Sequence, residues 1–170
     1  MKMWKRLTAS LVTGVILILS TCSWAMAVDI HKLSPNVPSA MQVVPYGSKP
    51  PKGDNGTHFL SQGAYYYSVV EVGAQVYTDR WLTGASQIEV SINGFKRVDG
   101  SALQVYDNVT VTVFDEDGKE IDSVWFDCYE NPRGGVVTLD TPGSTAEFYV
   151  RFTVKHTDCK FSFNGSITKV

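Results

Sequence analysis

Histidine and cysteine are scarce in this chain, and their scarcity argues against several classes of enzyme. Three of the 170 residues are histidines and three are cysteines. No two histidines have the spacing with which a hairpin or helix binds zinc, so we predict no metal site. The chain also lacks a nucleophile elbow and a glycine-rich loop of the kind that holds phosphate. We therefore predict a protein that is not an enzyme and uses no cofactor.

Runs of basic residues are absent as well, which argues against two classes of partner. The whole chain has 15 basic and 17 acidic residues, and residues 1–27 contain three of the basic ones and none of the acidic ones. The rest of the chain is therefore mildly acidic, with a net charge of −5. Such a chain has no basic surface for nucleic acid or for an anionic membrane.

Long apolar runs are confined to the start of the chain. The stretch Leu11–Leu19 is continuous and apolar, yet shorter than the ~20 residues of a membrane-spanning helix. Basic residues precede it, and the small residues of Ala25–Ala27 follow it, as in a cleavable export signal. We predict that residues 1–27 are a signal peptide and that the protein is secreted or surface-associated, with no membrane span.

The cysteines allow two further interpretations. The letters LSTC, ending at Cys22, approach a lipoprotein signal, so lipid anchoring at Cys22 is the alternative to secretion. Cleavage after residue 27 would leave Cys128 and Cys159. An even pair in an exported chain predicts one disulfide, with two free thiols or a catalytic cysteine as alternatives.

Proline and glycine are concentrated between the signal and the rest of the chain. Val28–Phe59 contains five of the seven prolines, and its segment Gly47–Gly56 combines proline, glycine and charge with little to bury. We interpret residues 28–59 as an N-terminal arm, in which Met41–Pro45 is a candidate for a short edge strand.

Strict alternation of apolar and polar residues dominates the chain after residue 60. It is clearest in four segments: Ser86–Asn93, Asn108–Asp115, Ser144–Lys155 and Cys159–Lys169. Period-two alternation with one polar face is typical of antiparallel strands that cover a core.

Four further segments have the composition of strands: Tyr65–Val72, Ala74–Thr78, Glu120–Cys128 and Gly134–Asp140. Asn-Gly, Asp-Gly and Pro-Gly turn signals separate the strands, and no segment has the pattern of an amphipathic helix. We predict that residues 60–170 form an all-β domain, an antiparallel β-sandwich of jelly-roll type with about eight strands.

The acidic segment Asp115–Glu120 resembles part of a calcium loop. A calcium loop would need a further oxygen ligand at position 119, where the chain has Lys119. Gly118 instead supplies the positive φ of a tight turn. We therefore predict a hairpin here and not a metal site.

Alternation also predicts aromatic residues on the outer faces of the sheets. Trp125 has the opposite parity to Phe126 and Cys128, and Tyr149 and Arg151 alternate with an inward apolar row. Together with Trp81 they are our candidate binding residues, because exposed aromatic and arginine side chains often mark binding surfaces. A bulge, a covering arm or packing on both faces would bury Trp125 instead.

Two segments carry a resemblance to known proteins. Val76–Asn93, with the letters VYTDRWLTGASQIEVSIN, resembles short exported β-sandwich proteins of anaerobic Gram-positive bacteria. Phe148–Lys169 is similar to the last two strands of those proteins and to jelly-roll domains appended to bacterial peptidases. The resemblance implies an exported β-sandwich and assigns no functional residue.

These observations favour a protein that acts by binding an extracellular partner, either a glycan or a protein. A carbohydrate-binding module is the first alternative, with Trp125, Tyr149 or Trp81 stacking on sugar rings. A hydrolytic enzyme of an unrecognised type is the second alternative, because acidic residues are numerous but no two of them stand out.

Overall fold

The computed structural model describes residues 47–155 and 158–170, and within these ranges every regular element is a β-strand. The strands are β1 (Thr57–Phe59), β2 (Tyr65–Val72), β3 (Gln75–Tyr77), β4 (Trp81–Thr83), β5 (Gln87–Arg97), β6 (Asn108–Asp115), β7 (Glu120–Asp127), β8 (Gly135–Asp140), β9 (Phe148–Val154) and β10 (Phe161–Lys169). The all-β class is confirmed. Two short strands, β1 and β4, are additional to the eight that the sequence predicted.

Several sequence predictions fall partly or wholly outside these ranges. The signal peptide and the edge strand at residues 41–45 lie outside the described residues. The end of the predicted arm is described, and its last three residues form β1, which pairs in parallel with β4. Gly47 also forms a β-bridge with Tyr77. No described segment forms a helix long and apolar enough to cross a membrane.

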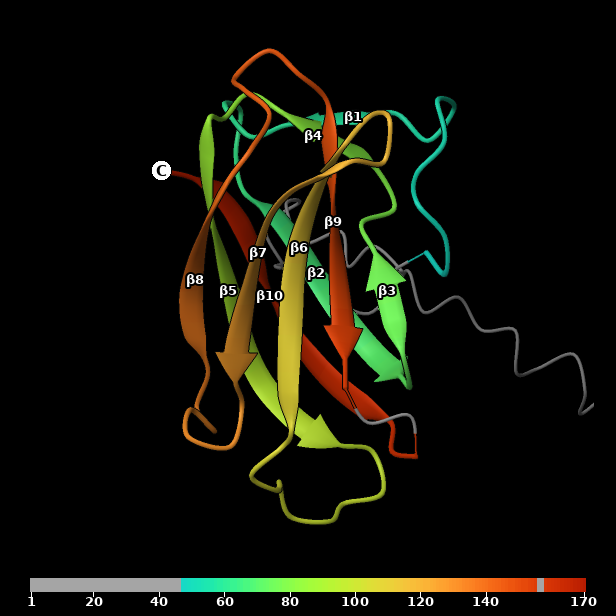
Figure 1. Cartoon of the computed structure of the whole chain (residues 1–170), viewed down its shortest axis with the longest axis vertical. Helices are drawn as coiled ribbons and strands as arrows, with labels where there is room; N and C mark the ends of the chain where they lie inside the picture. The colour runs from blue at the N-terminus through green and yellow to red at the C-terminus, as the bar shows by residue number, and fades with distance from the viewer. Residues whose placement is uncertain (1–46, 156–157) are drawn as a thin grey trace, which may run out of the picture. The chain divides into compact units, whose positions relative to one another are not determined.

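The strands form two sheets that face each other (Figure 1). The four-stranded sheet has the order β2-β10-β5-β8. The six-stranded sheet has the order β1-β4-β9-β6-β7, and β3 also pairs with β9. Apart from β1 and β4, the paired strands run antiparallel. Most successive strands lie in different sheets, although β3 and β4, and likewise β6 and β7, share the six-stranded sheet. The arrangement of two facing sheets is consistent with the predicted β-sandwich.

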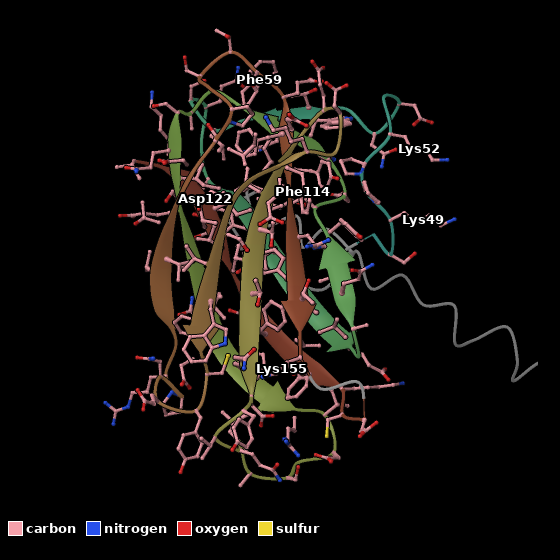
Figure 2. All side chains as sticks on the ribbon, in the orientation of Figure 1. Lys49, Lys52, Phe59, Phe114, Asp122 and Lys155 are labelled. Carbon is pink, nitrogen blue, oxygen red and sulfur yellow. The ribbon has the colours of Figure 1, made fainter. Side chains whose placement is uncertain are left out.

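The two sheets meet along one margin, where β7 and β8 are the edge strands. Asp122 on β7 accepts a hydrogen bond of 2.8 Å from the backbone N–H of Asp140 on β8 (Figure 2). This hydrogen bond joins the sheets at that margin and occupies backbone that an edge strand would otherwise expose.

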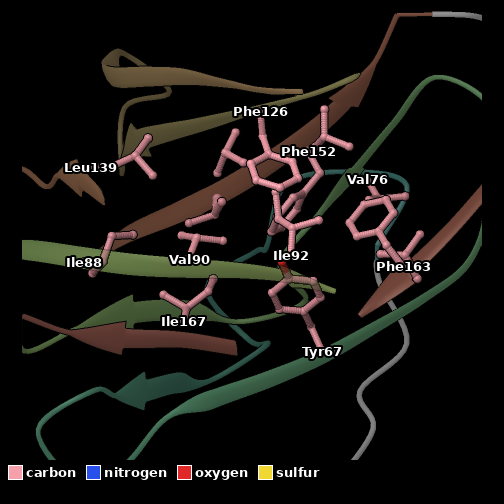
Figure 3. Packing of buried hydrophobic residues seen from close by; sticks show 14 of the residues in the cluster. Tyr67, Val76, Ile88, Val90, Ile92, Phe126, Leu139, Phe152, Phe163 and Ile167 are labelled. Carbon is pink, nitrogen blue, oxygen red and sulfur yellow. The ribbon is translucent and has the colours of Figure 1, made fainter. Parts of the chain in front are cut away.

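The core lies between the sheets and includes the inward rows that alternation predicted in β5, β6, β9 and β10 (Figure 3). Alternate apolar residues of β5 and β6 have no exposed surface: Ile88, Val90, Ile92, Val109, Val111 and Val113. Aromatic rings from opposite sheets pack together at the centre. The ring centroid of Phe152 on β9 lies 4.9 Å from that of Tyr67 on β2 and 5.6 Å from that of Phe163 on β10.

The predicted disulfide is wrong for this structure, because Cys128 and Cys159 are both free thiols. Cys128 follows β7, at the edge of the six-stranded sheet, whereas Cys159 precedes β10, inside the four-stranded sheet. Both side chains pack against the core, as their parity predicted. Inward orientation from two different sheets does not by itself bring two sulfur atoms to bonding distance.

The predicted hairpin at Asp115–Glu120 is confirmed. Strands β6 and β7 pair antiparallel across it, and Gly118 has a φ of +76°. The Oδ1 atom of Asp115 accepts hydrogen bonds from the backbone N–H groups of Asp117, at 3.1 Å, and Lys119, at 2.8 Å. The Asp115 carboxylate therefore stabilises the turn itself, in the manner of an Asx turn.

Candidate ligand-binding site

Trp125 lies on the outer face of the six-stranded sheet, as the alternation predicted. It pairs with Thr110 on β6, and 56% of its surface is exposed. The next residue, Phe126, points into the core and is 6% exposed. The strand is therefore regular at this point, and Trp125 faces solvent.

Tyr149 and Trp81 belong to an aromatic cluster at another part of the same outer face. Tyr149 stacks on Phe114 with 5.2 Å between ring centroids and meets Trp81 edge-on at 5.6 Å. Tyr77 completes the cluster at 6.1 Å from Tyr149. Tyr149 is only 6% exposed, so it lies on the predicted face but offers little surface to a ligand. The outer face of the sheet is packed here, as well as the inner face.

Arg151 packs on this aromatic cluster and does not reach out toward Trp125. Its guanidinium carbon lies 4.5 Å from the centre of the Phe114 ring, which is a cation–π contact. Arg151 pairs with Thr112 on β6, and β6 separates its strand from β7, which carries Trp125. The structure therefore does not bring Trp125, Tyr149 and Arg151 together in one patch.

A hollow of about 410 Å³ lies on the outer face of the four-stranded sheet. Three adjacent strands, β2, β10 and β5, form it, and this volume is within the range of small-molecule sites. Each residue that lines it is uncharged, so we name it the neutral hollow; its residues are Tyr66, Tyr67, Ser68, Ser91, Asn93, Asn164, Gly165 and Ser166.

Irregularities in two strands shape the neutral hollow. The register of β10 shifts against β2 between Phe161 and Phe163, and against β5 between Ser162 and Asn164. Such bulges bend a strand and increase its twist. Gly94, within β5, has a φ of +61°, which a residue with a side chain adopts at a cost. The sheet is therefore irregular around Asn93 and Asn164, the two asparagines of the hollow.

Tyr67 and Gly165 form the floor of the neutral hollow. The Tyr67 hydroxyl donates a 2.7 Å hydrogen bond to the backbone oxygen of Ser91, so its side chain bridges from β2 to β5 across β10. Burial raises the pKa of Tyr67 well above its ordinary value, so the hydroxyl keeps its proton for this bond. A Cβ atom at Gly165 would lie 1.8 Å from the Ser91 oxygen. Only glycine allows this close approach.

Hydrogen bonds also fix one wall of the neutral hollow. The Ser91 Oγ accepts a 2.8 Å hydrogen bond from the backbone N–H of Ser166, and the two serine hydroxyls lie 3.0 Å apart. Three other side chains of the hollow are open to solvent: Tyr66 is 42% exposed, and Asn93 and Asn164 are both exposed. The site thus combines a rigid floor with amide donors and acceptors and one exposed ring.

A second hollow, of about 690 Å³, adjoins the first and shares Ser68 and Asn164 with it. We name it the Lys96 hollow, after its exposed cation; its other residues are Val69, Val70, Gly94, Arg97, Val98, Gly100, Ser162 and Phe163. The two hollows follow the same three strands and form one trough across the sheet.

Arg97 also lines the Lys96 hollow, but a buried carboxylate neutralises its charge. Its Nε and Nη2 atoms donate hydrogen bonds of 2.8 and 2.9 Å to the two oxygens of Asp107. Asp107 is fully buried and also accepts a 2.8 Å bond from the backbone N–H of Gln104. This bidentate pair fastens the β5–β6 connection to the four-stranded sheet.

Comparison with known proteins assigns no family to the chain. No protein-family model matches it, and a search of curated proteins finds no match. In the part of the chain that the structure describes, no group of three or more histidine, cysteine, aspartate or glutamate side chains is placed to hold a metal ion. The two hollows and the exposed Trp125 are therefore the features of the molecule that point to a function.

Sequence reasoning did not select the residues of the neutral hollow, although one signal for them was present. Every second residue of the last strand forms its polar face, and four consecutive positions of that face are uncharged: Ser162, Asn164, Ser166 and Thr168. Outer faces of antiparallel sheets usually carry charge, so an uncharged polar row indicates a surface with another use. Its partners Tyr66 and Ser91 are distant in the sequence, and only strand pairing identifies them.

Proposed function

We propose that this protein is an exported carbohydrate-binding protein and that the neutral hollow is its binding site. The observation that carries the proposal is the composition of that hollow: amide and hydroxyl groups, one exposed tyrosine ring and no charge. A sugar presents hydroxyls, which exchange hydrogen bonds with amides, and apolar C–H faces, which pack on aromatic rings.

The residues that line the two hollows favour binding of a carbohydrate over its hydrolysis. A glycoside hydrolase acts with two carboxylates on either side of the scissile bond. Neither hollow is lined by an aspartate or a glutamate. The floor and one wall are held by hydrogen bonds, so the site is largely formed before a ligand arrives.

The export of the protein is part of the same proposal. The signal-like residues 1–27 and the resemblance to exported proteins support a mature chain that begins at Val28. N-terminal sequencing of protein recovered outside the cytoplasm tests the start site. A start at lipid-modified Cys22 would replace secretion with membrane anchoring.

The test of binding uses a panel of neutral polysaccharides, namely a β-glucan, a xylan and a mannan, in affinity electrophoresis and calorimetry. We expect at least one to bind the wild-type protein, and we expect Tyr66→Ala and Asn164→Ala each to weaken that binding about tenfold or more. Tyr129→Ala is the matched control, because Tyr129 is 46% exposed and lies outside both hollows. Undiminished binding by Tyr66→Ala would contradict the assignment of the neutral hollow as the binding site.

Trp125 supports a second candidate function, the capture of a protein partner. An indole ring that is 56% exposed on a sheet face is the kind of anchor that concentrates binding energy at protein interfaces. The two functions use opposite sheets, so variants of Trp125 and Tyr66 separate them.

A further inference from the structure

We propose that the glycan is acidic: a neutral sugar occupies the neutral hollow, and a neighbouring uronic acid residue places its carboxylate beside Lys96. This inference rests on the proposed function and adds a charge to the ligand. The two hollows adjoin each other and share Ser68 and Asn164. A ligand that leaves the neutral hollow across these residues enters the Lys96 hollow.

The length of the trough requires a chain of sugars and not a single ring. Along β10 the lining runs from Ser166 to Ser162, which is about 13 Å at the usual rise of a strand. Along β5 it runs from Ser91 to Val98, beyond the end of the strand. An oligosaccharide that lies along these strands therefore contacts both hollows at once.

Charge distinguishes the two ends of the trough. Lys96 is exposed on the outer face, and no ion pair of its ammonium group is found among the described residues. The other cation, Arg97, is bound to Asp107 by two hydrogen bonds. Lys96 is thus the charge in the trough that is available to a ligand.

Two acidic groups near this end already have partners on the protein. Glu71 pairs with Lys160. Asp99 accepts hydrogen bonds from the backbone N–H of Ser101, at 2.9 Å, and from its hydroxyl, at 2.7 Å. Neither carboxylate lines the hollow, so an incoming anion meets Lys96 without a carboxylate in the lining to repel it.

The experiment compares acidic polysaccharides with their own uncharged forms. The probes are polygalacturonate, alginate and hyaluronan, each tested beside its carboxyl-reduced counterpart, with calorimetry at low salt. We expect an acidic probe to bind about two- to fivefold more tightly than its reduced form, the range of an exposed ion pair. The difference should disappear in Lys96→Gln and in high salt. It should persist in Lys119→Gln, which removes an exposed lysine of the β6–β7 turn.

The outcomes distinguish failure of the acidic ligand from failure of the carbohydrate site itself. Equal binding of acidic and reduced forms, or binding of neutral polysaccharides alone, overturns the acidic ligand and leaves the carbohydrate site intact. Failure of every neutral and acidic probe overturns the proposed function as well.

Discussion

Single residues set the geometry of this surface, and Gly165 is the clearest case. A methyl group at this position would lie 1.8 Å from the backbone oxygen of Ser91 and 2.9 Å from the Tyr67 ring. Because both neighbours belong to the floor, the change cannot be relieved by turning one flexible side chain. We expect Gly165→Ala to lower the free energy of unfolding by about 3 kcal/mol or more, measured by urea denaturation.

The matched control is Gly53→Ala, because a Cβ atom at Gly53 would have no neighbour within 4 Å. That variant should unfold at nearly the same urea concentration as the wild type. If Gly165→Ala were as stable as the wild type, β10 could not approach the backbone of Ser91 this closely.

Replacement of Trp125, in contrast to that of Gly165, should leave the stability of the protein almost unchanged. The side chain of Trp125 is 56% exposed, so Trp125→Ala should change the free energy of unfolding by about 0.5 kcal/mol or less. Phe152→Ala, which removes a fully buried ring, should cost about 3–5 kcal/mol. Thermal or urea denaturation of both variants measures the contrast. A large loss of stability in Trp125→Ala would show that the indole is covered and would remove it from the candidate binding residues.

Among the elements, the β6–β7 hairpin shows how an acidic segment stabilises a turn. The Asp115 carboxylate accepts two backbone hydrogen bonds within the turn, and Lys119 stands where a calcium loop needs a ligand. We expect millimolar calcium to leave the melting temperature almost unchanged, because only a ligand that prefers the folded state stabilises it. Differential scanning calorimetry with and without calcium measures this. An increase of many degrees that Asp117→Ala abolishes would show a calcium site instead.

The whole molecule should lose stability at alkaline pH, because a buried thiol and two buried tyrosine hydroxyls keep their protons in the folded state. Burial, with the nearby charges of Asp127 and Asp107, raises the pKa of Cys128 from 9.0 to about 12. Below pH 9 the thiol is neutral in both states. Above pH 9 it ionises only in the unfolded chain, so stability falls as pH rises toward 12. The slope for this one group is at most about 1.4 kcal/mol per pH unit.

Two tyrosines act in the same direction at higher pH. Burial raises the pKa of Tyr67, and burial with a 2.6 Å hydrogen bond to Asp79 raises that of Tyr65. Urea denaturation at pH 7, 9, 10 and 11 measures the combined loss. Cys128→Ser should remove the part that begins near pH 9 and keep the part due to the tyrosines. Stability that stays constant from pH 8 to 11 would contradict the burial of these groups.

The sequence by itself determined eight of the ten described strands, the inward rows of four of them and the β6–β7 turn. These features are local: a strand turns alternate side chains to opposite faces, and glycine alone adopts a positive φ freely. The inward valines of β6 and the exposed Trp125 therefore followed from parity alone.

Only the tertiary structure decided which residues from distant segments lie next to each other. It set Cys128 and Cys159 beside the ends of strands that belong to different sheets. It also covered Tyr149 with Phe114 and Trp81, and joined Tyr66, Ser91 and Asn164 in one hollow. Strand order and register depend on packing between distant segments, and alternation within one segment carries no information about its neighbours.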